Sequence, residues 1–149
     1  MKVLLVASAG GHLQQLVWLA PWWREHERSW VTFDTPDARG MLSGERIAFA
    51  FHPTNRSLRN LARNAVLARR ILRDERPDLI VSTGAGVAVP FFALGRALGA
   101  KTVFLEPYDR VDGPSLTGRL VAPIADLVVL QRREQLRFHP AGVLLGPVR

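Results

Sequence analysis

The sequence predicts a doubly wound α/β fold, in which helices cover both faces of a parallel sheet. Short apolar runs rich in β-branched residues recur along the chain, and longer stretches with helical periodicity separate them. Strands that alternate with helices form parallel sheets, because each helix carries the chain back to the edge where the next strand begins. We expect strands at residues 3–6, 30–33, 47–51, 79–81, 102–105, 127–130 and 143–145.

Helical patterns fill the gaps between these strands at about residues 12–26, 56–75, 87–98 and 115–124. Residues 35–45 contain proline, aspartate and glycine and are interpreted as a loop. The sequence has no internal repeat or interior linker, and 149 residues suit one domain of ordinary size. We therefore expect a single Rossmann-like domain over residues 1–149.

The amino-terminal residues are interpreted as a strand rather than as a signal peptide. The apolar run after Lys2 is short and continues into a glycine turn and then a helical pattern. No stretch approaches the roughly 20 apolar residues that span a bilayer. Since the chain has no cysteine, we expect a protein of the reducing cytoplasm that is soluble or peripheral to a membrane.

Twenty basic residues against thirteen acidic ones give a formal charge of +7. This balance favours an anionic partner: nucleic acid, a phosphorylated lipid or a membrane surface. No RNA-binding signature is present, so we do not expect nucleic acid. The four histidines have no metal-ligand spacing, and the absence of cysteine excludes thiolate zinc sites, so we expect no metal.

The first candidate loop follows the first strand and contains Ser8, Gly10, Gly11 and His12. Ligands of such sheets bind beyond the carboxyl ends of the strands, where glycines let backbone amides approach an anion. An imidazole at this edge can accept a proton from a sugar hydroxyl near neutral pH. Tight turns also use paired glycines, and histidine is common at helix starts, so a purely structural role stays open.

A second glycine-rich turn follows the fourth strand and contains Thr83, Gly84, Ala85 and Gly86. It leads into an apolar helix with Pro90 near the start, where the missing N–H costs little. One such turn is a generic feature. Two of them on neighbouring strands indicate a shared anionic ligand.

The third candidate is Glu106, which stands where the fifth strand ends and precedes Tyr108 and Arg110. A carboxylate there can bind sugar hydroxyls, or act as a base if burial raises its pKa. Alternatively, Glu106 pairs with Arg110 across the loop. The sequence does not decide between these interpretations.

A dinucleotide site is compatible with the fold class, since Asp34 closes the second strand. However, Val89 stands where the third glycine of G-x-G-x-x-G would fall. The triphosphate-binding loop and the hydrolase nucleophile elbow are also missing. We expect no cofactor, and a nucleotide-dependent oxidoreductase is the least favoured alternative.

The helix expected at residues 56–75 carries an apolar stripe and a basic ridge. The stripe that we expect to face the sheet consists of Leu58, Leu61, Ala62, Ala65, Ala68 and Leu72. At helical pitch the ridge spans about 60 degrees and consists of Arg56, Arg59, Arg63 and Arg70. Such a ridge is either a solvated face or a contact with lipid headgroups, where each cation contributes about 1 kcal/mol.

Aromatic residues crowd the end of the first helix. Trp18 and Leu19 are expected to pack against the sheet. One helix cannot easily bury all three tryptophans, so we expect Trp22 or Trp23 to contact a membrane interface or a partner.

Four motifs resemble a family of two-part glycosyltransferases, and the last of them is the most specific. They are SAGGHLQQ at 8–15, PTNRS at 53–57, LIVSTGAG at 79–86 and FLEPYDRVDGPSLTGRL at 104–120. The chain resembles the small acceptor-side subunit of the eukaryotic enzyme that adds the second N-acetylglucosamine to dolichol-linked oligosaccharide. It is more similar still to bacterial PssD-type exopolysaccharide subunits. MurG, a single-chain relative, is similar more distantly, in the first glycine-histidine loop and in the glutamate after the fifth strand.

The resemblance implies the amino-terminal, acceptor-binding half of an inverting GT-B glycosyltransferase whose UDP-sugar-binding half is a separate subunit. Such a chain is expected to be inactive alone, and to bind a polyprenyl-diphosphate-linked sugar. It would recruit its partner to the cytoplasmic face of the membrane as a peripheral protein, during polysaccharide or lipid-linked oligosaccharide synthesis. Residues 145–149 would lie where a single-chain enzyme crosses its interdomain linker. A docking protein without catalytic function is the main alternative.

The resemblance also implies roles for individual residues. Either His12 or Glu106 would deprotonate the attacking hydroxyl, and the reaction would need no metal. The acceptor and its diphosphate would be bound by Ser8, Gly10, Gly11, Thr83, Gly84, Ala85, Gly86, Tyr108 and Arg110. Lipid or membrane contacts would come from Trp22, Trp23, Arg56, Arg59, Arg63 and Arg70.

Overall fold

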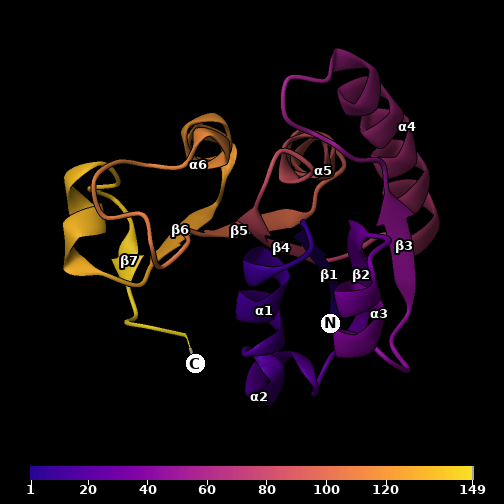
Figure 1. The fold of residues 1–149 in the computed structure, drawn as a ribbon, viewed down its shortest axis with the longest axis horizontal. Coiled ribbons are helices and arrows are strands. Elements are labelled where there is room, and N and C mark those ends of the chain that lie inside the picture. Colours follow the sequence, from indigo (N-terminus) through magenta and orange to yellow (C-terminus); the bar gives the residue numbers. More distant parts are fainter. Residues whose placement is uncertain (149) are drawn as a thin grey trace.

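A computed structural model describes residues 1–148, so only the last residue of the segment 145–149 lies outside it. Seven parallel strands form one sheet in the order β3-β2-β1-β4-β5-β6-β7 (Figure 1). The strands are β1 (Lys2–Ala7), β2 (Glu27–Phe33), β3 (Ile47–Ala50), β4 (Leu79–Gly84), β5 (Lys101–Leu105), β6 (Leu127–Leu130) and β7 (Val143–Leu144). All seven expected strands are present, and the strand order reverses at β1 as in a doubly wound sheet, so the predicted fold class is confirmed.

Helices cover both faces of the sheet (Figure 1). One face carries α1 (Gly11–Val17), α2 (Ala20–Trp23) and α3 (Pro36–Met41), and the other carries α4 (Leu58–Glu75), α5 (Ala88–Ala97) and α6 (Leu116–Val121). Two 3-10 helices follow, η1 (Ala122–Ile124) and η2 (Arg133–Arg137). Side chains alternate along β1, so Leu4 and Val6 join the core under α4 and α5, whereas Val3 and Leu5 join the core under α1.

Two helix predictions need correction on the α1 side of the sheet. The expected helix at 12–26 is two short helices, because Pro21 cannot continue a helix but is tolerated in the first turn of a new one. The expected loop at 35–45 contains α3. Its start is fixed by Thr35, whose hydroxyl accepts the Ala38 amide at 3.3 Å, and by Pro36 in the first turn.

The buried face of α4 also differs from the expected stripe. Leu58 is 83 % exposed, and the residues that face inward are Asn60, Asn64, Leu67, Ala68, Ile71 and Leu72. Asn64 pairs with both backbone groups of Phe51, at 2.8 and 2.9 Å, and Asn60 donates to the carbonyl oxygen of Pro53 at 2.7 Å. These asparagines satisfy the backbone of the segment after β3, so two polar side chains that were not part of the expected stripe lie on the buried face of α4.

The tryptophans are also placed differently than expected. Trp23 is buried, donates to the carbonyl oxygen of Leu16 at 2.9 Å and packs edge-on against Trp30. Its predicted contact with a membrane is therefore wrong. Trp18, which was expected in the core, is 45 % exposed. Within residues 1–148, no helix combines the length and the apolar character that a bilayer crossing requires.

Candidate functional site

His12 lies at the carboxyl edge of the sheet, where α1 begins next to the end of β4. Its Nδ1 is 2.8 Å from the carbonyl oxygen of Thr83, and the Thr83 hydroxyl donates to the carbonyl oxygen of His12 at 2.6 Å. A carbonyl oxygen only accepts, so Nδ1 must carry the hydrogen, which leaves the lone pair of the neutral ring on Nε2. The imidazole is half-buried, and in this tautomer Nε2 is the nitrogen that can accept a proton, as a general base must.

Gly84 forms the contact surface beneath this ring. Its φ of +109° is a conformation that favours glycine, and a Cβ there would lie 3.3 Å from Cε1 of His12. The same Cβ position is 4.0 Å from Cβ of Thr117 in α6. The first glycine loop, the second glycine loop and the start of α6 therefore meet around His12.

The first glycine loop is partly occupied by the protein itself. The amide of Gly10 donates to Oδ2 of Asp37 on α3 at 3.1 Å. Hydrogen bonds from the Thr35 side chain and from the Gly10 backbone hold the pKa of Asp37 below its usual range. A carboxylate that is ionised at neutral pH therefore takes this amide in the present conformation, and the binding of a diphosphate by Gly10 stays a prediction. The hydroxyls of Ser8 and Thr83 likewise donate to backbone carbonyl oxygens.

The second glycine loop has backbone amides that are available to bind an anion. Turn bonds from Ala88 to Ala85 and from Val89 to Gly86 lead into α5. Within residues 1–148, the amides of Ala85, Gly86 and Val87 have no backbone acceptor, and they stand at the positive end of a ten-residue helix. A Cβ on Gly86 would lie 3.2 Å from Thr54, so this loop packs against the PTNRS segment.

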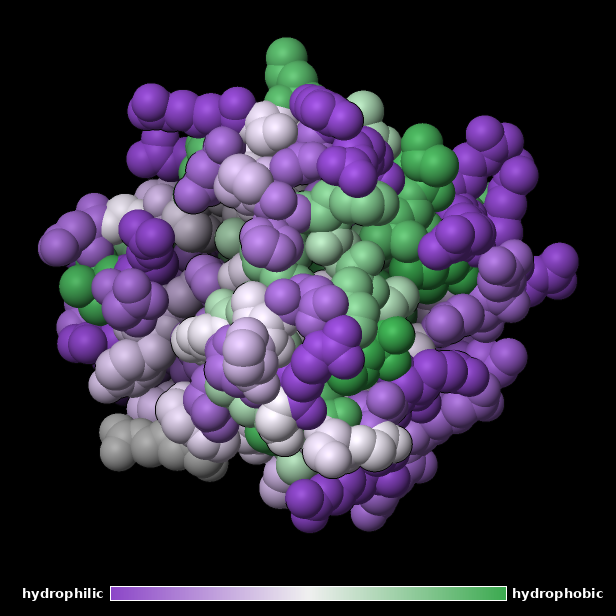
Figure 2. All heavy atoms as spheres, turned by 45° about the vertical axis from the view of Figure 1, so that its right-hand side comes forward, coloured by the Kyte–Doolittle hydropathy of each residue, from purple (hydrophilic) through white to green (hydrophobic). Residues whose placement is uncertain are grey.

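A groove of about 670 Å³ opens beside Gly86, between α4 and α6. Its apolar walls come from both helices and from α5, and its polar rim comes from the segment before α4. The lining residues are Thr54, Asn55, Arg56, Ser57, Leu58, Leu61, Gly86, Val89, Leu116, Thr117 and Leu120. Figure 2, in which the side that carries α4 comes forward, shows apolar surface bordered by hydrophilic residues. The groove was not predictable from the sequence, because the apolar pattern of α4 placed Leu58 and Leu61 in the core, whereas both are exposed.

The basic ridge on α4 is only partly as expected. Arg59, Arg63 and Arg70 are exposed on the helix, whereas Arg56 precedes it in a left-handed turn with φ of +53° at the rim of the groove. Arg63 stacks over the ring of Phe51, 3.8 Å from its centroid. Trp22 belongs to α2 on the opposite face of the sheet (Figure 1). The tryptophan and the arginines that were expected to contact lipid together therefore do not share one face.

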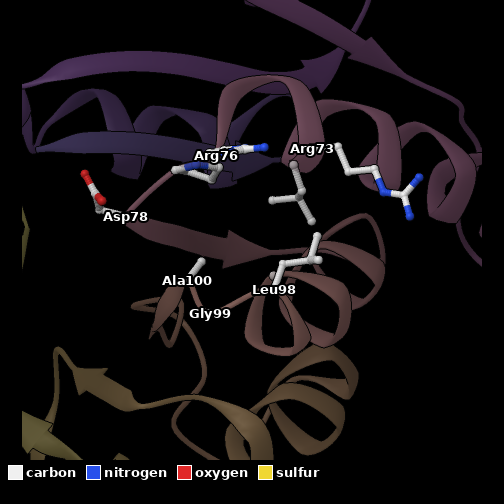
Figure 3. A pocket seen from close by; sticks show the side chains of 9 residues that line it. Arg73, Arg76, Asp78, Leu98, Gly99 and Ala100 are labelled. Atoms are coloured by element: carbon white, nitrogen blue, oxygen red, sulfur yellow. The ribbon is translucent and has the colours of Figure 1, made fainter.

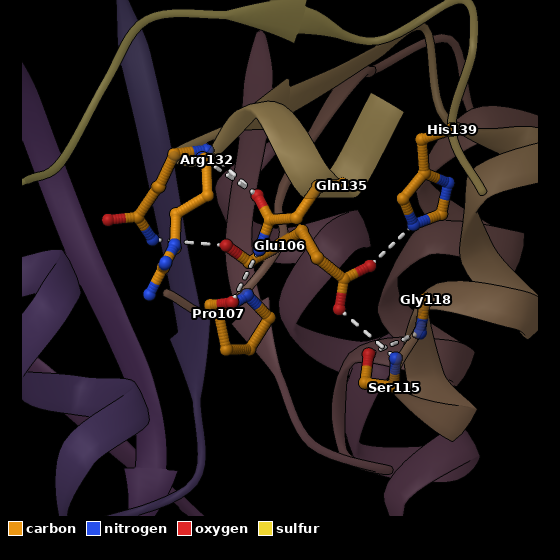
Figure 4. A network of polar contacts seen from close by, with 8 residues as sticks. Glu106, Pro107, Ser115, Gly118, Arg132, Gln135 and His139 are labelled. Carbon is orange, nitrogen blue, oxygen red and sulfur yellow. Dashed lines mark hydrogen bonds and ion pairs between the residues drawn. The ribbon is translucent and has the colours of Figure 1, made fainter. Parts of the chain in front are cut away.

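Glu106 lies at the same edge, but its carboxylate is enclosed by the protein (Figure 4). The residue is fully buried, with Oε2 2.5 Å from Nε2 of His139 and Oε1 accepting the Ser115 amide at 3.1 Å. The interpretation of Glu106 as a partner of Arg110 is therefore wrong. Arg110 is exposed, and its backbone amide donates to Pro107.

Of two further cavities, one is lined by predicted site residues and the other is not. One of about 360 Å³ lies between α1 and the loop after β5, and is lined by Gly11, Gln14, Gln15, Trp18, Tyr108, Asp109, Pro147 and Val148. The other, of about 670 Å³, lies at the opposite edge of the sheet between the ends of α4 and α5, where Arg73 and Leu98 line it (Figure 3). It contains none of the predicted site residues.

Known proteins are similar to this chain over most of its length. Residues 50–143 match the family described as "Oligosaccharide biosynthesis protein Alg14 like". The match includes the second glycine loop, the groove and Glu106, and it excludes His12.

Two relatives carry the name "UDP-N-acetylglucosamine--N-acetylmuramyl-(pentapeptide) pyrophosphoryl-undecaprenol N-acetylglucosamine transferase". The protein of Chlorobium luteolum is 31 % identical over 154 residues, covering 90 % of this chain and 41 % of the relative. That of Alkaliphilus metalliredigens is 30 % identical over 93 residues, covering 62 % of this chain and 24 % of the relative. The chain therefore spans less than half the length of these relatives.

Solved structures show the same fold. MurG of Acinetobacter baumannii has a TM-score of 0.78 at 19 % identity, and the match covers 97 % of this chain and 45 % of MurG. The UDP-N-acetylglucosamine 2-epimerase of Rickettsia bellii has a TM-score of 0.76 at 12 % identity, covering 98 % of this chain and 44 % of the epimerase.

Proposed function

The chain belongs to the Alg14-like family of oligosaccharide biosynthesis proteins, and from this premise we propose that it is the acceptor-binding subunit of an inverting glycosyltransferase. Its acceptor is a sugar linked to a polyprenyl diphosphate. Its partner is a separate subunit that binds a UDP-sugar. The observation that carries this proposal is a base-competent histidine beside an amide-rich helix start, where an apolar groove begins.

His12 supplies the base in this proposal. The hydroxyl oxygen of the acceptor attacks the anomeric carbon of the UDP-sugar while Nε2 of His12 takes the hydroxyl proton. The bond from the anomeric carbon to the diphosphate oxygen breaks, and UDP leaves with the bonding electron pair. One direct displacement inverts the anomeric centre. Positioned bases of this kind contribute about 10²- to 10⁴-fold to the rate.

The diphosphate of the acceptor binds at the start of α5. The amides of Ala85, Gly86 and Val87 have no backbone acceptor among residues 1–148, and Arg56 lines the same groove as Gly86. A helix amino terminus and a nearby arginine favour a diphosphate, because both supply positive charge and hydrogen-bond donors. The groove beyond them then receives the first part of the polyprenyl chain.

The same groove supports contact with a membrane. Leu58 and Leu116 are 83 % and 74 % exposed on its two walls, which is unusual for large apolar side chains that lie close together. Arg59 and Arg63 lie on the neighbouring face of α4 and attract anionic headgroups. We propose that the leucines enter the interfacial region and bring the active-site edge, with its partner subunit, to the lipid-linked acceptor.

Reconstitution with the partner tests this function. A subunit of similar size encoded next to this chain would be co-purified with it and assayed on vesicles that carry polyprenyl-diphosphate sugars, with a panel of UDP-sugars beginning with UDP-N-acetylglucosamine. Transfer by the pair and none by either subunit alone is the expected result. Turnover by this chain alone would contradict the subunit assignment. Full turnover by a pair that lacks the His12 imidazole would indicate a docking protein instead.

A further inference from the structure

The buried carboxylate of Glu106 has no role in the proposed chemistry, yet it joins three separate parts of the chain. Glu106 follows β5 and accepts the amide of Ser115, the N-cap residue of α6, and His139 follows η2. Oε2 of Glu106 lies 2.5 Å from Nε2 of His139, so the two side chains share one hydrogen in this contact. Both carboxylate oxygens are therefore used within the protein.

The first turn of α6 packs tightly against the Glu106 carboxylate, with no space for a side chain at Gly118. A Cβ on Gly118 would lie 2.5 Å from Oε2 of Glu106 and 2.9 Å from the hydroxyl of Ser115. That hydroxyl accepts the Gly118 amide at 2.9 Å. The glycine lets the first turn of α6 approach the carboxylate closely, as Figure 4 shows.

Residues 107–114, the loop between Glu106 and Ser115, are held along their length by η2 and its flanks. Gln135 donates to the carbonyl oxygen of Pro107 at 2.8 Å, and Arg137 donates to that of Val111 at 3.1 Å. The Gln131 amide donates both to the carbonyl oxygen of Glu106 at 3.0 Å and to Gln15 on α1 at 2.6 Å. The Glu106–His139 pair closes this set of contacts at the end of the loop.

Segments next to Glu106 and Ser115 line two cavities. Tyr108 and Asp109, two and three residues after Glu106, line the cavity beside α1. Leu116 and Thr117, directly after Ser115, line the apolar groove. One buried carboxylate therefore fixes a wall of each cavity.

We propose that Glu106 is a positioning residue rather than the base, and that its pairing with His139 and Ser115 sets the 107–114 loop and the start of α6 in place to receive the acceptor. This inference rests on the proposed function, because it assigns Glu106 within that same site. It also separates the two residues that sequence reasoning left as alternatives. His12 keeps an unengaged ring nitrogen, whereas Glu106 has both oxygens engaged.

Conservative and disruptive variants distinguish these roles. In Glu106→Gln, the side-chain oxygen still accepts the Ser115 amide, and the amide group donates to Nε2 of His139 once the ring hydrogen moves to Nδ1. We expect the reconstituted pair to keep kcat within about threefold of wild type, since the geometry survives. A base at this position would instead cost about 10²- to 10⁴-fold in kcat, and that result in a folded variant would overturn the proposal.

The His139 side provides a matched pair of variants. His139→Gln retains a donor near the position of Nε2, whereas His139→Phe keeps a ring and removes the donor. We expect His139→Phe to raise the KM for the lipid acceptor by about tenfold or more with a smaller change in kcat, and His139→Gln to restore most of it. Equal behaviour of the two variants would contradict a role for the hydrogen bond.

A measurement that does not depend on sugar transfer tests the positioning role separately from the proposed function. Amide hydrogen exchange in the isolated full-length chain should be faster at Ser115 and in residues 107–114 in His139→Phe than in wild type or His139→Gln. Unchanged exchange there would overturn the positioning role even if the pair is active. If the wild-type pair transfers no sugar, the proposed function fails, while the exchange pattern still decides whether this pair orders the loop.

Discussion

Nδ1 of His12 lies 2.8 Å from the carbonyl oxygen of Thr83, and this contact decides which ring nitrogen can take a proton. The hydrogen on Nδ1 is held by the backbone of the second glycine loop, so the basic lone pair is on Nε2. The interaction thus links the sheet geometry to the chemistry, because the end of β4 orients the imidazole that begins α1.

Replacing His12 with asparagine tests this arrangement. The asparagine amide can still donate to Thr83, but it offers no basic nitrogen. We expect kcat of the reconstituted pair to fall by about 10²- to 10⁴-fold with little change in thermal stability. Steady-state kinetics and a melting curve measure the two quantities. His26→Asn, at the other end of the α1–α2 pair, is the control and should keep full activity; equal rates for both variants would exclude His12 as the base.

Much of the fold was predictable from local patterns. All seven strands coincide with apolar runs. In β1 the run is uninterrupted because a strand buried on both faces has no polar alternation, whereas both residues of β7 are apolar although exposed. The face of α4 was not predictable in this way. Asn60 and Asn64 are buried because they bind the backbone of Phe51 and Pro53, and no periodicity indicates that demand.

The loops that form the candidate site were predictable from the sequence, whereas the hydrogen-bond partners of its side chains were not. The topology brings His12 and the second glycine loop to one edge, which the sequence indicated. The partner of Glu106 is His139, 33 positions away, and lies in a segment with no recognised motif. The carboxylate was assigned to Arg110 or to catalysis because only near neighbours are visible in a sequence.

Gly118→Ala tests the close packing beneath α6. The added methyl group would lie 2.5 Å from Oε2 of Glu106, so either the helix or the carboxylate must move. Overpacking of this kind costs about 1–3 kcal/mol, which exceeds the gain of up to about 1 kcal/mol from the helix propensity of alanine. Urea unfolding measures the difference. Gly113→Ala, where no atom lies within 4 Å of the added Cβ, is the control and should be nearly neutral.

Glu45 provides a stability test that depends on pH. Two hydrogen bonds from Arg28, at 2.7 and 2.8 Å, and one from Trp30 hold the pKa of Glu45 below its ordinary 4.5, with Arg28 as the main cause. A lowered carboxyl pKa in the folded state stabilises the protein above the ordinary pKa, and this contribution is lost as the pH falls through the lowered value. Glu45→Gln should therefore cost about 1 kcal/mol at neutral pH and progressively less under acidic conditions.

The unfolding free energies of wild type and variant, measured by denaturant titration from pH 7 to pH 3, should therefore converge as the pH falls. Glu25→Gln, an exposed carboxyl in the same region, is the matched control and should show no such convergence. A constant difference between wild type and Glu45→Gln across this range would show that the Arg28 pair does not contribute through the charge of Glu45.

The groove between α4 and α6 makes the membrane proposal testable without the partner subunit. Leu58→Glu and Leu116→Glu place a charge on opposite walls at side chains that are 83 % and 74 % exposed, so each should change stability by less than about 0.5 kcal/mol. Both should weaken binding to vesicles of phosphatidylglycerol and phosphatidylethanolamine, because a carboxylate enters the apolar interface poorly and is repelled by anionic headgroups. Val66→Glu adds the same charge to α4 at a side chain that is 72 % exposed and does not line the groove. Since all three variants change the net charge equally, co-sedimentation with vesicles separates a contact made by the groove from general electrostatic attraction. A loss for Val66→Glu as large as that for the two groove variants would assign membrane binding to net charge and remove the groove from it.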